Sequence, residues 1–230
     1  MTRTGGITAE IDEALGIQPV PPTACLRLGV LASGRGSNLQ ALLDSRAGGQ
    51  FPAQVVAVAS NRPNAPALER ARRAGVPTEA FPQTRYASLA DRDAAVQAFL
   101  EAHGVELVVL AGYDRVLAPG MLAAYRNRLI NIHPSLLPAF AGTLQAQAAA
   151  FEHGVKVSGC TVHFVDEQLD GGPIILQRPV ALDEADTAES FAARILAEEH
   201  QALPDAIRLI AEGRLRLVGR RCRILPPSRR

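Results

Sequence analysis

The sequence has no tryptophan, a single lysine (Lys156) and only three cysteines among its 230 residues. Cys25, Cys160 and Cys222 are scattered and odd in number, which excludes a disulfide framework and the ligand spacing of a zinc site. This cysteine usage is typical of a reducing compartment, so we expect a cytoplasmic protein that binds no metal. No apolar run approaches the roughly 20 residues of a membrane span. The N-terminus also lacks the apolar segment of a secretion signal.

An excess of charge of either sign is missing as well, since the formal net charge at pH 7 is +1. No general field therefore attracts nucleic acid or a membrane surface. The residues are 47% apolar and 20% charged, which is typical of a globular protein and excludes a disordered or fibrous chain.

The length fits one domain with short appendages, at roughly 100–200 residues per domain. Prolines interrupt any periodicity near the end of residues 1–25, so we predict a leader outside the fold, with a short surface helix at 7–15 as the alternative. Residues 26–213 form the predicted domain, and residues 214–230 a basic hairpin and tail.

Apolar runs of strand length alternate with amphipathic segments through the first half of the chain. The predicted strands are 26–33, 53–60, 76–81, 106–112 and 128–133, and the predicted helices are 37–45, 67–75, 88–103 and 118–125. Continuous apolar strands alternating with helices indicate an α/β fold, with an open Rossmann-like, mostly parallel sheet and helices on both faces.

The second half of the chain changes character. Strands are predicted at 157–165 and 172–180, and their connection is too short for a crossover helix, so they either pair antiparallel or diverge. A long amphipathic helix follows at 187–212. Seven arginines and no acidic residue come after Glu212, which we interpret as a solvated basic tail.

The first chemical signal is the glycine-rich stretch SGRGSN between the first strand and the first helix. Gly34 and Gly36 allow a tight turn, and the unpaired N–H groups of the following helix favour an anion. The stretch lacks the Lys of a Walker A loop, and Leu39 breaks the dinucleotide pattern. A single phosphate fits better, and a plain turn between strand and helix is the alternative.

The second signal combines residues from two distant segments. Asn131 and His133 lie two apart in a predicted strand and project from one face, and Asp170 lies in the turn LDGGP. A carboxylate there would orient His133 as a general acid and base. His133 and Asp170 each have an alternative structural role, as a buried core histidine and as a turn aspartate bonded to its own backbone. His163 on a later strand is a possible further site residue, or a core histidine bonded to the backbone.

Taken together, these segments resemble the folate-dependent glycinamide ribonucleotide formyltransferases of purine biosynthesis. The resemblance runs from about residue 26 to residue 213 and depends on ordered motifs. These are LASGRGSNLQAL, VVAVASNRPNAPALERARRAG, VVLAGYDRVL, NIHPSLLPAF, TVHFVDEQLDGGPIILQ and the later EEH. It implies transfer of a formyl group from 10-formyltetrahydrofolate, a co-substrate, to the amine of glycinamide ribonucleotide.

The resemblance also implies roles for individual residues. Asn131 would bind the formyl oxygen, His133 would carry the proton, and Asp170 would hold His133 protonated. The ribonucleotide would be bound by Gly34, Arg35, Gly36, Ser37, Asn38 and Glu199. The folate would be bound by Arg115, Val116, Leu117, Asn131, Asp166, Glu167, Gln168, Leu169 and Asp170.

The chain departs from the family pattern at three positions that bear on the substrates. Asp114 stands where methionine is common, and Leu89 stands where an arginine often contacts folate, a role that Arg85 or Arg92 could take over. Leu196 replaces a polar residue that touches the ribonucleotide in some members.

Three other functions are compatible with parts of this pattern. A formyltetrahydrofolate hydrolase uses a similar His and Asp, but water needs no phosphate loop. A methionyl-tRNA formyltransferase carries a further C-terminal domain, for which the chain has no room. A non-catalytic binding module would have lost Asn131, His133 or Asp170. We expect small-molecule substrates, no nucleic acid partner, and a monomer or homodimer.

Overall fold

The computed structural model describes residues 16–227. The strands are β1 (Leu26–Leu31), β2 (Ala53–Ser60), β3 (Thr78–Ala80), β4 (Leu107–Leu110), β5 (Leu129–His133), β6 (Val157–Phe164), β7 (Ile174–Ala181), β8 (Leu215–Val218) and β9 (Arg221–Ile224). The helices are α2 (Ser37–Ala47), α3 (Pro66–Arg73), α4 (Leu89–Ala102), α5 (Pro119–Ala124), α6 (Ala146–Glu152) and α7 (Ala188–Ala211), with a 3-10 turn η1 (Gln83–Arg85).

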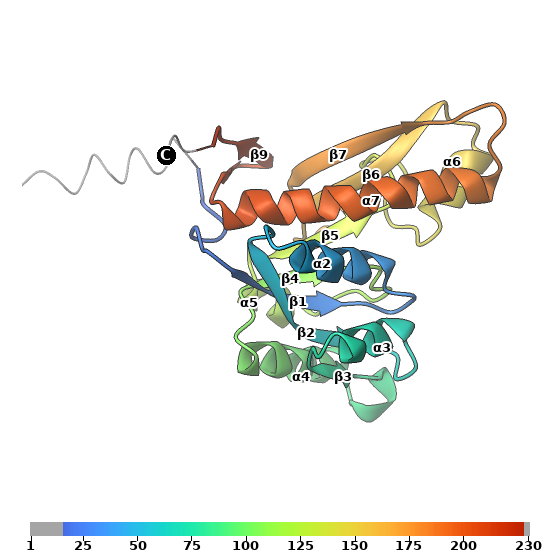
Figure 1. The fold of residues 1–230 in the computed structure, drawn as a ribbon. Coiled ribbons are helices and arrows are strands. Elements are labelled where there is room, and N and C mark those ends of the chain that lie inside the picture. Colours follow the sequence, from blue (N-terminus) through green and yellow to red (C-terminus); the bar gives the residue numbers. More distant parts are fainter. Residues whose placement is uncertain (1–15, 228–230) are drawn as a thin grey trace, which may run out of the picture.

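All strands of the described chain join one sheet in the order β3-β2-β1-β4-β5-β6-β7-β9-β8 (Figure 1). Strands β1 to β5 run parallel, and β6 and β7 each run antiparallel to the preceding strand. The predicted α/β class and the antiparallel pairing of the two late strands are therefore confirmed.

The sheet is covered on both faces, as the continuous apolar strands require. Successive residues of a strand point to opposite faces, so Leu28 and Val30 of β1 pack in one core with α2, α3 and α7, while Leu31 packs in a second core with α4 and α5. Helix α7 lies along β6 and β7 (Figure 1). None of the helices between residues 16 and 227 is long and apolar enough to cross a membrane.

Residues 16–25 correct the prediction that the leader lies outside the fold. Ile17 exchanges two backbone hydrogen bonds of 2.8 Å with Leu217 of β8, and Val20 is buried in the core. Because β8 is the last strand of the sheet, its outer backbone groups need partners, and the leader supplies them. Residues 1–15, including the possible helix at 7–15, lie outside the described residues.

Other differences from the prediction are local. Helix α6 was not predicted, because its alanine-rich sequence AQAAAFE has no apolar periodicity. The C-terminal hairpin is present as β8 and β9, but its arginines do not all project from a solvated tail. One of them contacts the loop that carries Asp170.

Candidate active site

The order of the strands places a crevice where β1 and β4 lie side by side. From β1 the chain proceeds to β2 and β3 in one direction, and then to β4 and β5 in the other. Ligands of open α/β sheets bind at the carboxyl ends of strands at such a switch point. The glycine-rich stretch after β1, Ala111 and Gly112 after β4, and Pro134 after β5 all meet there.

A cavity of about 470 Å³ opens at this crevice. It is lined by Gly34, Arg35, Gly36, Ser37, Asn38, Ala111, Gly112, Ile132, Pro134, Gln147, Glu189, Ala192, Ala193, Leu196 and Glu199. All six residues predicted to bind the ribonucleotide are in this set. Helix α2 begins at Ser37 and directs its unpaired N–H groups toward the same space, which suits an anion.

The two glycines of the stretch play different parts. Gly36 has φ 71°, and a Cβ there would lie 2.7 Å from the Cβ of Ala67 on α3. A side chain at Gly36 would therefore collide with a helix instead of occupying the anion's space. A Cβ on Gly34 would meet no atom within 4 Å, so only Gly34 leaves space open toward a ligand.

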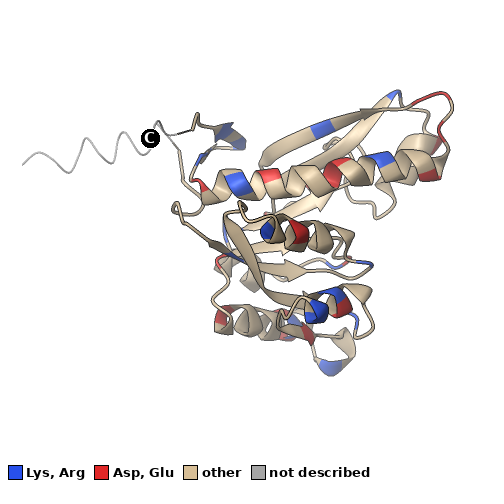
Figure 2. Ribbon diagram, in the orientation of Figure 1, with Lys and Arg blue, Asp and Glu red and all other residues tan. Residues whose placement is uncertain are grey.

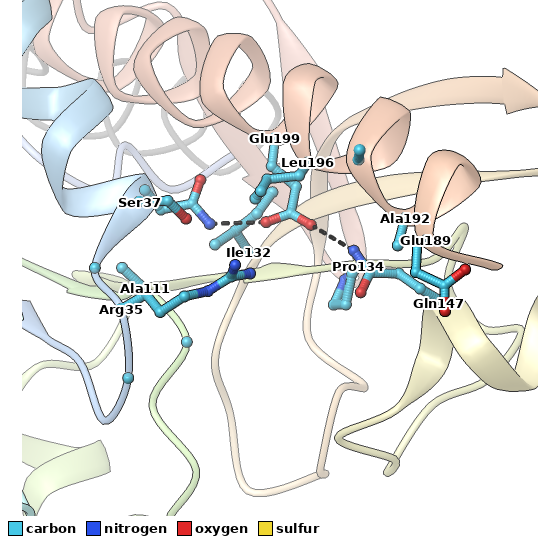
Figure 3. A pocket seen from close by; sticks show the side chains of 15 residues that line it. Arg35, Ser37, Ala111, Ile132, Pro134, Gln147, Glu189, Ala192, Leu196 and Glu199 are labelled. Atoms are coloured by element: carbon cyan, nitrogen blue, oxygen red, sulfur yellow. Dashed lines mark hydrogen bonds between the residues drawn. The ribbon is translucent and has the colours of Figure 1, made fainter. Parts of the chain in front are cut away.

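Glu199 on α7 is the buried carboxyl group of the cavity, with 5% of its surface exposed. Its Oε2 accepts a hydrogen bond of 2.7 Å from Asn38, and its Oε1 accepts one of 3.5 Å from Gln147 on α6. Figure 3 shows Glu199 between these two elements, with Arg35 extending toward it from the loop. The pKa of Glu199 is raised to about 7, because the effect of burial exceeds the opposing effect of the Asn38 hydrogen bond.

His133 and Asp170 come together as the sequence predicts. The Nδ1 of His133 lies 3.5 Å from Oδ2 of Asp170, and its Nε2 lies 3.1 Å from the carbonyl oxygen of Phe140. Both ring nitrogens therefore face an acceptor. The imidazole is buried at the end of β5, with 7% of its side chain exposed.

Asp170 is held in an uncommon backbone conformation, with φ 51°. Its Oδ2 also accepts a hydrogen bond of 2.8 Å from the backbone N–H of Gly142. The connection from β6 to β7 thus turns back over the sheet and presents this carboxylate to His133. Phe140 and Gly142 were not predicted as site residues, because backbone groups leave no sequence signal.

His163 contacts Asn131 directly across the β5–β6 pair. Its Nε2 lies 3.2 Å from Nδ2 of Asn131, and its Nδ1 lies 2.8 Å from the carbonyl oxygen of Phe164. Burial lowers the pKa of His163, so the neutral ring donates to Phe164 and accepts from Asn131. His163 therefore bonds to the backbone, as in the core-histidine interpretation, and it also contacts Asn131, so its role in the site stays a prediction.

The cavity and the Asn131–His133–Asp170 group lie on opposite faces of the sheet. Ile130 and Ile132 pack in the core with α7, so Asn131 and His133 point to the face of α4 and α5. Pro134 follows His133 and lines the cavity, so the two regions meet at the end of β5.

The predicted folate residues form loops beside Asn131 and Asp170. Arg115 is exposed and lies 3.6 Å from Asp114, while Leu117 is buried beneath the segment after β4. Val116 and Leu169 are apolar yet 64% and 62% exposed, and Leu144 is 78% exposed. In the β6–β7 loop, Asp166 accepts a hydrogen bond from the N–H of Gln168; Glu167 is exposed beside it.

Asp114, the departure from the family's methionine, belongs to a polar cluster at the ends of β1, β2 and β4. It accepts a hydrogen bond of 2.9 Å from Asn61 and pairs with Arg62. Burial alone would raise the pKa of Asp114. The contacts with Ser33 and Asn61 lower it, as do the charges of Arg62 and Arg115, and the net pKa lies below the usual value.

Arg92 does not replace the missing folate arginine. Its side chain is 1% exposed and forms an ion pair of 2.6 Å with Asp93, which is itself 2% exposed. Asp93 accepts from the N–H of Ala118, and Arg92 donates to the carbonyl of Val116 over 3.4 Å, so this pair holds the segment after β4. Leu89 begins α4, partly exposed, and Leu196 lines the cavity as an apolar wall.

Within residues 16–227, no group of three or more His, Cys, Asp or Glu side chains is arranged to hold a metal ion. The polar side chains gathered at the end of β5 are the amide of Asn131, the imidazole of His133 and the carboxylate of Asp170.

Comparisons with known proteins agree with this geometry. Residues 26–207 match the sequence profile of the formyl transferase family. A phosphoribosylglycinamide formyltransferase of Haemophilus influenzae is 40% identical over 191 residues, which are 83% of this chain and 90% of that protein. A trifunctional purine biosynthetic protein of Gallus gallus is 41% identical over 197 residues, but the chain spans only 20% of its length.

The fold agrees with a solved structure as well. The crystal structure of glycinamide ribonucleotide transformylase 1 from Symbiobacterium toebii is similar with a TM-score of 0.85 and 56% sequence identity. The match covers 88% of this chain and 95% of that one.

Proposed function

The chain belongs to the formyl transferase family, and from this premise we propose that it transfers the formyl group of 10-formyltetrahydrofolate to the amine of glycinamide ribonucleotide. The observation that carries the proposal is the approach of His133 and Asp170 to 3.5 Å beside Asn131, at the edge of an anion-binding cavity. The products are formylglycinamide ribonucleotide and tetrahydrofolate.

Asn131 stabilises the negative charge that develops on the formyl oxygen. Its Nδ2 carries two N–H groups, and His163 accepts one of them at 3.2 Å, which leaves the other for the substrate. One preorganised donor to such an oxygen lowers the barrier by roughly 3–4 kcal/mol.

His133 moves the proton. The amine nitrogen bonds to the formyl carbon and the bond from that carbon to the folate nitrogen breaks, so one proton must pass from the amine to the folate nitrogen. His133 lies at the end of β5, where the two substrates would meet, and the Asp170 carboxylate, 3.5 Å from its Nδ1, orients the ring. General acid and base catalysis of this kind contributes about 10²–10⁴-fold.

The ribonucleotide occupies the cavity on the α7 face. The N–H groups of Gly34 to Asn38 at the start of α2 bind its phosphate, and Arg35 adds a positive charge. Glu199 accepts hydrogen bonds from the ribose hydroxyls. The Oδ1 of Asn38 is buried without a partner among the described residues, which fits a donor group of the ligand there.

The folate lies on the other face, between the segment after β4 and the β6–β7 loop. Val116, Leu144 and Leu169 expose apolar side chains on loops around the polar group, which suits a flat aromatic ring. Arg115 offers a cation, Leu117 supports the segment from beneath, and the loop from Asp166 to Asp170 closes over the ring.

The alternative, a formyltetrahydrofolate hydrolase, makes less use of this site. Water as the acceptor would leave the cavity, the start of α2 and the buried Glu199 without a ligand. We further propose a cytoplasmic location, small-molecule substrates without nucleic acid, and a monomer or homodimer.

The proposal is tested by mixing the protein with glycinamide ribonucleotide and 10-formyltetrahydrofolate and following tetrahydrofolate release. We expect turnover that requires the ribonucleotide, and a loss of about 10²–10⁴-fold in His133→Ala and Asp170→Asn. His103→Ala, at the end of α4, serves as the matched histidine control. Cleavage of the folate without the ribonucleotide would establish the hydrolase instead, and near-normal rates in both variants would refute the mechanism.

A further inference from the structure

The C-terminal hairpin reaches the loop that carries Asp170. Arg220, in the turn between β8 and β9, donates a hydrogen bond from Nη2 to the carbonyl oxygen of Gly171. Gly171 directly follows Asp170, whereas Arg220 lies beyond residue 207, where the match to the family ends. Figure 2 shows the hairpin as a basic element at one end of α7.

The hairpin that carries Arg220 is held in place by burial and by backbone pairing on both sides. Leu215 and Leu217 of β8 are buried in the core with α7. On one side Ile17 pairs with Leu217, and on the other Arg221 pairs with Ile174 at the start of β7. Because the backbone on both sides of the turn is paired, Arg220 starts from a defined position.

The loop between β6 and β7 is held differently, through side-chain contacts such as those of Asp170 instead of a paired backbone. Its base is fixed at Gly172, where a Cβ would lie 1.8 Å from the carbonyl oxygen of Phe164. Between Asp166 and Gly171 the backbone bonds of the loop are internal, such as the 2.9 Å bond from Gly171 N–H to Gln168. The positive φ of Asp170 is a conformation that persists only when its surroundings impose it.

We propose that Arg220 is a positioning residue for Asp170. By binding the carbonyl of the next residue, its guanidinium fixes the peptide plane that follows Asp170 and so keeps the carboxylate directed at His133. The Gly142 N–H holds the carboxylate from one side, and Arg220 holds the backbone from the other. Arginine suits this role because it is always charged and its planar donors are rigid.

The inference depends on the proposed function, in which Asp170 acts through His133. It also revises the interpretation of the C-terminal arginines as a solvated tail, because Arg220, although exposed, donates a hydrogen bond to the backbone of another segment. The hairpin pairs with Ile174 at the start of β7, which follows the loop, and this pairing brings Arg220 within reach of Gly171.

The test compares Arg220→Ala and Arg220→Lys with Arg223→Ala, an exposed arginine of the same hairpin that serves as the control. We expect Arg220→Ala to lower kcat by roughly three- to tenfold, the range for one hydrogen bond. The KM for the ribonucleotide and the thermal midpoint should stay at the control values. Arg220→Lys should recover most of the rate, since the ammonium can still donate.

A double-mutant cycle then decides whether Arg220 acts through Asp170. In the Asp170→Asn background, single-turnover rates should be the same with and without Arg220→Ala. An independent loss of the same size in both backgrounds, or equal rates for Arg220→Ala and Arg223→Ala, would overturn the inference. If Asp170→Asn alone leaves the rate unchanged, the proposed function fails instead, so the two failures are distinguishable.

Discussion

Replacing Glu199 with glutamine should stabilise the protein at alkaline pH while weakening the ribonucleotide site. The carboxyl group is buried, no cation contacts it within residues 16–227, and burial raises its pKa from 4.5 to about 7. Between those values the folded protein holds a proton on Glu199 that the unfolded chain has lost. The free energy of unfolding therefore falls as pH rises from 4.5 to about 7, and stays low above it.

The size of this loss in the free energy of unfolding follows from the difference between the two pKa values of Glu199. At about 1.4 kcal/mol for each factor of ten in acidity, the ionised Glu199 costs about 3 kcal/mol at alkaline pH. Glutamine carries no charge at any pH, and its carbonyl can still accept from Nδ2 of Asn38.

The assay is urea unfolding of both proteins from about pH 5 to about pH 8.5, where the stability gained by Glu199→Gln should grow by about 2–3 kcal/mol. Glu198→Gln is the matched control, because this neighbouring glutamate is a third exposed and already paired with Arg178. The reasoning is refuted if Glu199→Gln and the parent protein lose stability in parallel as the pH rises. Ribonucleotide affinity, measured by calorimetry, should decrease in Glu199→Gln only.

Two further predictions concern positions whose surroundings are unusually restrictive. Gly36→Ala should destabilise the protein by about 2–4 kcal/mol in urea unfolding, because it combines a left-handed backbone with contact at 2.7 Å to Ala67. Gly34→Ala should leave stability unchanged and weaken ribonucleotide binding, and equal stability losses in both variants would contradict this. Asp93→Ala should cost about 3–5 kcal/mol, since it leaves the buried charge of Arg92 unpaired. A loss of under about 1 kcal/mol in thermal unfolding would show that water reaches the pair.

The sequence predicts the strands and most helices because their apolar patterns follow from the periodicity of each element. It also brings Asn131, His133 and Asp170 together, through motifs in two segments. It misses contacts that depend on how distant segments meet. The close approach of Gly36 to Ala67 on α3 is one such contact, and the buried ion pair of Arg92 with Asp93 is another.

Contacts made by backbone atoms are a second kind of feature that the sequence does not predict. Phe140 and Gly171 contribute carbonyl oxygens to the neighbourhood of His133 and Asp170. Every residue has a carbonyl, so nothing in the sequence distinguishes these two. The docking of residues 16–25 on β8 is missed for the same reason, because it is made by main-chain atoms of Ile17.

The two backbone hydrogen bonds between Ile17 and Leu217 place the beginning of the described chain beside the hairpin that precedes its end. A short linker could therefore join the two ends, and new termini could be opened in an exposed loop elsewhere, as circular permutation requires. Trimming the chain past Ile17 would instead leave β8 with free donors and acceptors along its outer side. Such an edge is a template for pairing with another molecule, so Ile17 and its neighbours also protect the protein from self-association.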